Sequence, residues 1–481
     1  MVRSFFLLSA IVARAALAAP AEVPEYSVTY DPQTAHAAVR LCLSGTYPQM
    51  VFAADSPRAM HFLGDLHRSG AGPVETLRSG WRARGWHAGE CLSYSADIGA
   101  IASLHSDAGS RYGEVLITDP QYWLLHAAAQ SAAGARLSIE LPQGWTIAAP
   151  WHELERAGES IRFQIPDTPP DWSAGVALGH FEEQRIAQPQ GNVRVAVLFD
   201  VDANQRAKLM AWMQSATSAV LKAYGRMPIP DVSIGIVSIR STSYAARFLA
   251  LLQPSAVFGG ESARGQGNAI QLVVDPDRPQ AEFTGDWTAI HELSHLMHPY
   301  LGDRGNWLAE GLATYYQNVL RARAGIFTPA QAWQHLGDGF ADAAVANSDE
   351  TLEQAAASMG ESHAFQRVYW SGAAYWLSVD VELRRASGGK LNVETALSRF
   401  RDCCLPAYRE WKPEDFVAKL DALTGVHTFS RRYGEFARAT RFPDWRKVYA
   451  DLGVRRNGGE QTLFDETAPD AAIRAAITAA R

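Results

Sequence analysis

The chain has 481 residues, of which 47% are hydrophobic and 20% are charged, and its formal net charge at pH 7 is -7. The chain is longer than a domain with a single hydrophobic core usually is, so two or three domains are expected. The composition excludes a disordered chain, and the acidic balance argues against a nucleic-acid partner, which would require a basic surface.

Residues 1–18 resemble a secretory signal peptide. Arg3 provides the positive start, residues 4–13 form a short apolar run, and Ala16-Leu17-Ala18 matches an A-x-A cleavage site. An uncleaved membrane anchor is the alternative, but the run is too short to span a bilayer. We therefore expect an exported protein, periplasmic or secreted, with no stable membrane insertion after cleavage.

Four cysteines fit an exported protein. Cys42 and Cys91 lie in the same N-terminal region and could form a disulfide. Cys403 and Cys404 are adjacent, and a bond between neighbours strains the backbone, so four buried free thiols remain the alternative. The cysteines form no C-x-x-C pair, so a cysteine-based zinc site is not indicated.

Residues 19–190 are predicted to form an N-terminal β domain of the sandwich type. Short alternating or apolar segments recur there, each bounded by glycine, proline or aspartate. The expected strands are residues 25–31, 113–119, 135–143, 144–151, 160–166 and 180–186.

Residues 191–325 change to an α/β pattern, which we assign to a catalytic subdomain. The expected strands are 192–200, 232–239 and 269–275, and the expected helices are 203–224, 286–300 and 307–324. Thr284 or Asp286 could cap the second of these helices.

Residues 326–458 are predicted to form an α-helical domain that completes the active site. The expected helices are 329–336, 351–358, 369–385, 393–400, 413–423 and 430–439. Residues 459–481 are alanine-rich and polar, and we expect them to form a loosely attached tail. The predicted fold class is multidomain α+β, and the sequence indicates no oligomeric state.

The strongest functional signal is H-E-x-x-H, with His291 and His295 at its ends, followed by Glu310 in the phrase WLAEGLATYY. Positions four apart share a helix face, so both imidazoles can bind one ion. If the next helix brings Glu310 to the same point, two histidines and one carboxylate form the ligand set of a catalytic zinc. We predict one Zn²⁺ per chain.

Glu292 lies between the two histidines, where it cannot comfortably bind the same ion. It is placed to accept a proton from an attacking water and to pass it to the leaving amine. A metal that polarises a carbonyl, together with a general base, predicts hydrolysis, most often of a peptide bond. The alternative is a solvated helix face, but Ile290, Leu293 and Leu296 beside the motif indicate a packed helix.

The pattern H-E-x-x-H followed by W-L-x-E-G-x-A-x-Y resembles the gluzincin metallopeptidases, the group of thermolysin and aminopeptidase N, and within it the glycyl aminopeptidase family. Further stretches that are similar to that family are residues 141–148, 166–175, 258–262, 271–275 and 366–390. The resemblance implies a thermolysin-like catalytic subdomain and a peptide or protein substrate. Two departures are the short interval between His295 and Glu310 and the expected lack of a PDZ-like domain at the C-terminal end.

The resemblance also implies roles for residues outside the zinc motif. Tyr369 matches the tyrosine that stabilises the oxyanion, with a buried core tyrosine as the alternative, and Glu261 could bind the free α-amine of a substrate. The strand at 269–275 could present its backbone to an extended peptide. We expect His298 at the rim of the site and Thr314 in a hydrogen bond to a metal ligand.

We therefore predict an exported zinc metallopeptidase, with an aminopeptidase as the first choice. An endopeptidase with the same mechanism is the first alternative. A peptide-binding protein that keeps the fold without cutting is the second.

Overall fold

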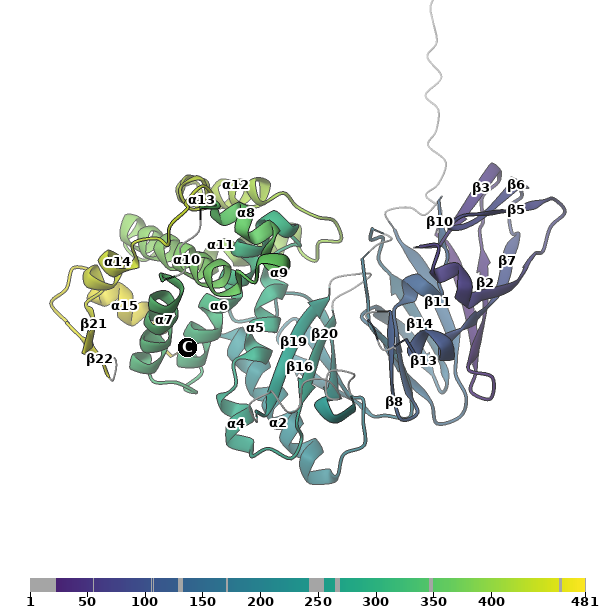
Figure 1. Ribbon diagram of the computed structural model, residues 1–481, viewed down its shortest axis with the longest axis horizontal. Helices are drawn as coiled ribbons and strands as arrows, with labels where there is room; N and C mark the ends of the chain where they lie inside the picture. Colours follow the sequence, from purple (N-terminus) through teal and green to yellow (C-terminus); the bar gives the residue numbers. More distant parts are fainter. Residues whose placement is uncertain are drawn as a thin grey trace, which may run out of the picture.

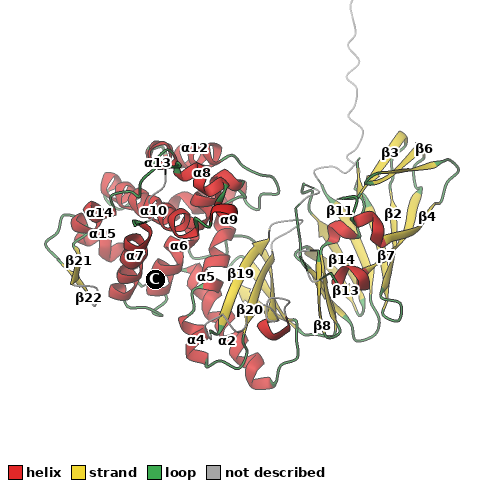
Figure 2. Cartoon of the chain, in the orientation of Figure 1, coloured by secondary structure: helices red, strands yellow, loops and turns green. Residues whose placement is uncertain are grey.

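The computed structural model describes residues 23–54, 56–104, 106, 108–128, 133–169, 172–241, 255–263, 269–345, 349–457 and 461–480, so the predicted signal peptide lies outside the described residues. The molecule is elongated, with β sheets at the N-terminal end, helices at the C-terminal end and a mixed layer between them (Figures 1 and 2). No helix in these ranges is both long and apolar enough to cross a bilayer.

The N-terminal part consists of three sheets built from short strands with alternating burial, as in β1 (Glu25–Asp31), where Tyr26 and Val28 face the core. The seven-stranded sheet has the order β13 (His152–Ala157), β14 (Ser160–Ile165), β11 (Ala135–Glu140), β1 (Glu25–Asp31), β2 (His36–Cys42), β7 (Cys91–Asp97), β4 (Leu63–Arg68). A four-stranded sheet has the order β10 (His126–Ala127), β3 (Tyr47–Ala53), β6 (Gly80–Trp86), β5 (Val74–Leu77). Another has the order β12 (Thr146–Ala148), β15 (Val176–Gly179), β9 (Val115–Thr118), β8 (Gly109–Tyr112).

Both candidate disulfides are present. Cys42 of β2 lies opposite Cys91 of the adjacent strand β7, and the two are bonded. The neighbours Cys403 and Cys404 are bonded at the end of α11 (Val393–Cys404). The described residues include no free cysteine.

The middle part is a five-stranded sheet covered by α2 (Ala203–Leu221), α4 (Gln280–Gly285) and α5 (Thr288–Ser294) (Figure 1). Its order is β16 (Glu183–Gln188), β17 (Gly191–Val197), β18 (Asp231–Ser238), β20 (Ala269–Val274), β19 (Val257–Ala263). The pairs β17–β18 and β18–β20 are parallel, whereas β19 runs antiparallel to β20.

Two predictions about this sheet require correction. The strand expected at 180–186 is β16, which pairs with β17, so it belongs to the middle sheet rather than to the N-terminal domain. The strand expected at 269–275 is β20, which is paired on both sides by β18 and β19, so its backbone cannot accept a peptide strand. Among the described strands, β19 forms that edge of the sheet instead.

The C-terminal part is a helical layer around the long helices α6 (Asn306–Arg323) and α10 (Phe365–Ser387). Its other helices are α7 (Pro329–Ala343), α8 (Leu352–Ala357), α9 (Met359–Ser362), α11, α12 (Pro413–Thr424), α13 (Thr428–Ala437), α14 (Trp445–Asp451) and α15 (Ala471–Thr478). α6 and α10 approach closely because Gly311 and Gly372 meet at their crossing. A Cβ at Gly372 would lie 1.8 Å from the Trp307 carbonyl oxygen.

The predicted loose tail is wrong for residues 461–480. β22 (Gln461–Phe464) pairs with β21 (Val454–Asn457), and α15 packs into the helical core with Ile477 fully buried. Arg323 Nε donates to the Ile477 carbonyl at 2.7 Å, which binds α15 to α6. Ile473 and Ile477 of α15 lie four residues apart, so they share one helix face, and both pack into the core.

A buried charge network also joins the helices that carry the site. Arg323 of α6 and Arg384 of α10 both pair with Glu394 of α11, and Arg384 pairs with Asp380 one turn away. Two arginines and two acids balance each other. Each of these buried charges therefore has a partner, and removing one of them would leave another buried charge uncompensated.

Candidate metal centre

The helix α5 places the motif residues in the interior. The Thr288 amide donates to Asp286 Oδ1 at 2.7 Å, so of the two predicted caps Asp286 binds the first turn. All seven residues of α5 are buried, and the backbone continues as a 3-10 turn, η4 (His295–Met297). After a second 3-10 turn, η5 (Asp303–Gly305), the chain enters α6, which returns beside α5.

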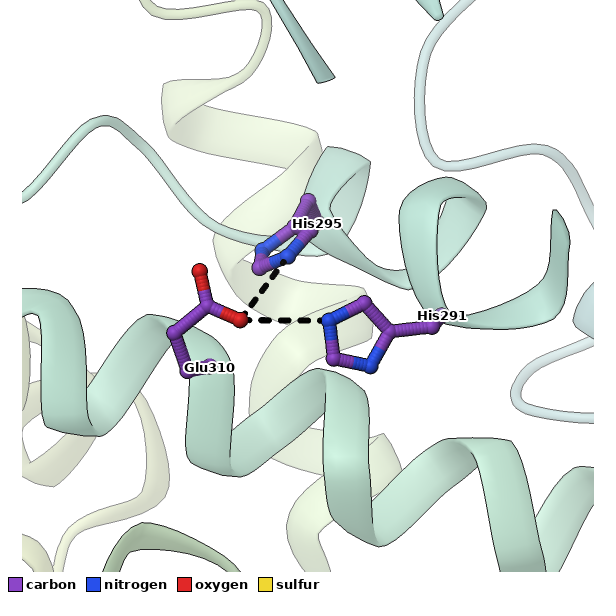
Figure 3. Close-up of side chains that lie close together, drawn as sticks. All are labelled: His291, His295 and Glu310. Carbon is purple, nitrogen blue, oxygen red and sulfur yellow. Dashed lines mark hydrogen bonds and ion pairs between the residues drawn. The ribbon is translucent and has the colours of Figure 1, made fainter. Parts of the chain in front are cut away.

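His291, His295 and Glu310 meet between α5 and α6 (Figure 3). The Glu310 Oε2 atom lies 3.1 Å from His291 Nε2 and 3.6 Å from His295 Nε2. The three ligand atoms all lie within 4.8 Å of one another, and they offer two imidazole nitrogens and one carboxylate oxygen. This donor set and spacing fit a catalytic zinc ion.

Hydrogen bonds behind the rings orient both histidines. His291 Nδ1 lies 2.8 Å from Gln317 Oε1, which is an acceptor, so the proton of a neutral His291 belongs on Nδ1 and Nε2 is left as a ligand. His298 Nδ1 donates to the Pro299 carbonyl at 2.7 Å, so His298 Nε2 can accept from His295 Nδ1 at 3.2 Å. His295 Nε2 is then also left as a ligand.

Two residues behave differently from their sequence-based predictions. His298, expected at the rim, is 3% exposed and hydrogen-bonded behind His295. Thr314, expected to bond a metal ligand, is buried, and its Oγ1 has no hydrogen-bond partner among the described residues. Gln317, one turn further along α6, holds the position predicted for Thr314.

The electrostatics of the cluster favour a cation. Burial alone would raise the pKa of Glu310, but the attraction of His295 and hydrogen bonds from both histidines hold that pKa far below its usual range. Burial would lower the pKa of His291, but the hydrogen bond to Glu310, the charges of Glu292 and Glu310 and the hydrogen bond to Gln317 together outweigh burial and raise the pKa. An ionised carboxylate therefore attracts positive charge to the point where the three ligand atoms converge.

Glu292 points to the same cavity and is held from the edge strand. Ser262 Oγ of β19 donates to Glu292 Oε2 at 2.8 Å and lies 2.9 Å from the Glu292 carbonyl oxygen. A Cβ on Gly260 would lie 2.7 Å from Glu292 Cγ, so glycine allows β19 to approach α5 this closely. Sequence reasoning missed Ser262, although it lies within the stretch 258–262 that resembles the family.

Tyr369, in the first turns of α10, stacks on His291 with ring centroids 5.9 Å apart and an angle of 18° between the planes. Burial is the main cause that raises the pKa of Tyr369 strongly. The negative charge of Glu310 and a hydrogen bond to Glu310 raise this pKa further. The phenol therefore stays protonated at neutral pH and can act as a hydrogen-bond donor.

A cavity of about 630 Å³ contains these groups and receives residues from all three parts of the molecule. Trp172 comes from the β14–β15 loop, Glu261 from β19, Tyr369 from α10 and Glu410 from the α11–α12 loop. Glu261, singled out from the sequence, thus lines the same cavity as the metal cluster. Trp172 was not singled out, although it lies within the stretch 166–175 that resembles the family. Glu410 was not predicted, because nothing local marks a loop residue that tertiary structure brings to a site.

Residues 291–376 match the family model described as M61 glycyl aminopeptidase. The matched segment begins at His291 of the motif and extends through α10, so it contains the three ligand residues and Tyr369. No curated protein sequence matches the chain.

Solved structures share the fold at low identity. An aminopeptidase N family protein from Idiomarina loihiensis matches with a TM-score of 0.66 and 13% identity, over 90% of this chain and 78% of that one. An M1 zinc metallopeptidase from Deinococcus radiodurans, bound to a Tyr-Ser-Ala substrate, matches with a TM-score of 0.53 and 12% identity, over 88% of this chain and 94% of that one. Native yeast LTA4 hydrolase matches with a TM-score of 0.51 and 13% identity, over 89% of this chain and 67% of that one.

The chain has the multidomain α+β fold of the M1 zinc aminopeptidases, as predicted. The segment that matches the M61 glycyl aminopeptidase model contains His291, His295 and Glu310, whose ligand atoms form a zinc-like cluster, and this combination indicates a zinc metallopeptidase. The predicted resemblance to zinc metallopeptidases and the predicted enzyme class are therefore confirmed.

Proposed function

We propose that this chain is an exported aminopeptidase that hydrolyses the first peptide bond of peptides carrying a free N-terminus. The observation that carries the proposal is the position of Glu261, an additional carboxylate on β19 that lines the same cavity as the His291, His295 and Glu310 cluster. A carboxylate at that place can bind an α-ammonium group and so limit cleavage to the end of a peptide.

His291, His295 and Glu310 would hold one Zn²⁺ ion, with their orientation set by the hydrogen bonds behind them. When bound, the ion supplies Lewis acidity toward the scissile carbonyl and toward water. Glu292 accepts a proton from the attacking water and delivers it to the leaving amine. The Ser262 hydroxyl keeps the Glu292 carboxylate directed into the cavity.

Tyr369 donates its phenolic hydrogen to the oxygen on which negative charge develops during attack. Its raised pKa keeps that hydrogen in place at neutral pH. An extended substrate can add to β19, since this strand is the described edge of the sheet and its residues Gly260, Glu261 and Ser262 line the cavity.

The experiment compares one short peptide with a free N-terminus and the same peptide acetylated, using protein loaded with zinc. We expect release of the first residue from the free peptide only. Glu292→Gln should keep the metal and lose turnover by several orders of magnitude. Internal cleavage of the acetylated peptide would assign an endopeptidase, and saturable binding without turnover would assign a peptide-binding protein.

Export rests on the signal-like pattern of residues 1–18 and on the two disulfides, which persist mainly in oxidising compartments. Expression of the full chain in a bacterial host should yield mature protein outside the cytoplasm. Its N-terminal sequence should begin at Ala19. Full-length protein that remains in the cytoplasm would contradict the proposal.

A further inference from the structure

The loop between α11 and α12, residues 405–412, is anchored on both sides of Glu410. Arg409 pairs with Asp167 of the N-terminal part and also donates to the Asp167 carbonyl at 3.0 Å. The Trp411 amide donates to the Tyr300 carbonyl at 2.9 Å. Because both neighbours of Glu410 are bound to other segments, the fold determines where Glu410 lies.

Glu410 lines the active-site cavity and rests against Gly302 in the short segment between His295 and Glu310. A Cβ on Gly302 would lie 2.4 Å from Glu410 Oε1, so the carboxylate of this exposed side chain lies directly against Gly302. Among the described residues, no hydrogen bond or ion pair involves this carboxylate, since the adjacent Arg409 is engaged with Asp167.

The charges of the cavity leave a place for a second substrate cation. Four acids line it, and the described residues of its lining include no lysine or arginine. A divalent ion would balance Glu292 and Glu310, and the α-ammonium of a substrate would balance Glu261. Glu410 then remains without a counter-charge, and a substrate with a neutral side chain does not provide one.

Two aromatic rings line the same cavity as Glu410. Trp172 and Tyr300 are half-buried and meet edge to face with their ring centroids 5.5 Å apart. Long basic side chains place their aliphatic stem along such apolar surface while the charged head reaches an acid or the face of a ring.

We infer that Glu410, with Trp172 and Tyr300, forms a subsite for a lysine or arginine side chain of a substrate residue next to the scissile bond. The inference rests on the proposed function, because it concerns how a peptide is selected by the same cavity. It assigns Glu410 to specificity and gives it no part in the chemical step.

The test uses zinc-loaded full-length protein and pairs of peptides that differ only by lysine or norleucine, first at the N-terminal position and then at the second position. We expect kcat/KM to favour lysine by about 10-fold at one of the two positions, the size of one charge-assisted contact. Glu410→Gln should bring this ratio close to unity. The matched control Asp415→Asn removes an exposed charge from the first turn of α12 and should keep the ratio.

Binding gives a second readout that does not need turnover. Zinc-loaded Glu292→Gln should bind the preferred lysine peptide about 10-fold more tightly than its norleucine partner, and added salt should reduce the difference. Equal use of both peptides by the wild type, or a lysine preference that survives Glu410→Gln, would overturn the inference while leaving an aminopeptidase in place. Internal cleavage of acetylated peptides would overturn the aminopeptidase proposal and leave the lysine ratio as the test of Glu410. A chain that neither binds nor cleaves any of these peptides would overturn both.

Discussion

Gln317 provides a direct test of how the metal ligands are oriented. Its side-chain oxygen lies 2.8 Å from His291 Nδ1, and both side chains are buried, with Gln317 only 8% exposed. Gln317→Leu has similar volume but no acceptor. The Nδ1 proton would then lack a partner, and the tautomer that protonates Nε2, which cannot bind a metal, would gain population.

A buried donor left without its acceptor costs about 1–3 kcal/mol, and about 1.4 kcal/mol corresponds to tenfold in affinity. We therefore expect Gln317→Leu to weaken zinc binding by about 10- to 100-fold, the range typical of such outer hydrogen bonds. Gln317→Glu keeps an acceptor and should retain tight binding.

Competition with a chromophoric chelator under equilibrium conditions measures the affinity. Thr314→Val is the matched control, since Thr314 lies on the same helix, is equally buried and has a hydroxyl with no partner among the described residues. We expect the control to bind zinc like the wild type. Unchanged affinity in Gln317→Leu, or an equal loss in Thr314→Val, would refute the argument.

Other predictions concern the scaffold and the metal. Gly372→Ala should lower the thermal midpoint and the activity together, because the new methyl group would collide with the Trp307 carbonyl where α6 crosses α10. The expected loss in the free energy of unfolding is about 1–3 kcal/mol, and a fully active variant would contradict this expectation. Glu394→Gln should destabilise the fold by about 3–5 kcal/mol in denaturant unfolding, since it leaves two buried arginines without their shared acid. Hydrogen bonds and charges from two arginines outweigh burial and lower the pKa of Glu153, so its stabilising contribution is present above the ordinary glutamate value of 4.5 and is lost as the pH falls below it. Glu153→Gln should therefore lower the thermal midpoint at neutral pH and change it less near pH ~3, and an equal change at both would be contrary evidence. Removing zinc with a chelator should abolish turnover and lower the thermal midpoint, and added zinc should restore both. At a free zinc concentration about 100 times its Kd, binding adds about 2.7 kcal/mol to the free energy of unfolding.

The sequence by itself determined the ligands His291, His295 and Glu310 and most of the elements around them. Two histidines four residues apart lie on the same face of a helix whatever that helix packs against, so their relative position is set locally. The same holds for the alternation of β1 and for the helices after residue 326, whose apolar faces repeat at helical spacing. These patterns need no knowledge of distant contacts.

Tertiary structure alone decided what surrounds the ligands. Gln317 meets His291 across 26 positions, Ser262 meets Glu292 across 30, and Glu410 reaches Gly302 from a loop more than a hundred residues away. The place of β19 at the sheet edge and the burial of α15 likewise depend on which segments pair. A polar residue on a loop or helix looks the same in sequence whether it faces water or a site. Only the packing of distant segments separates the two cases.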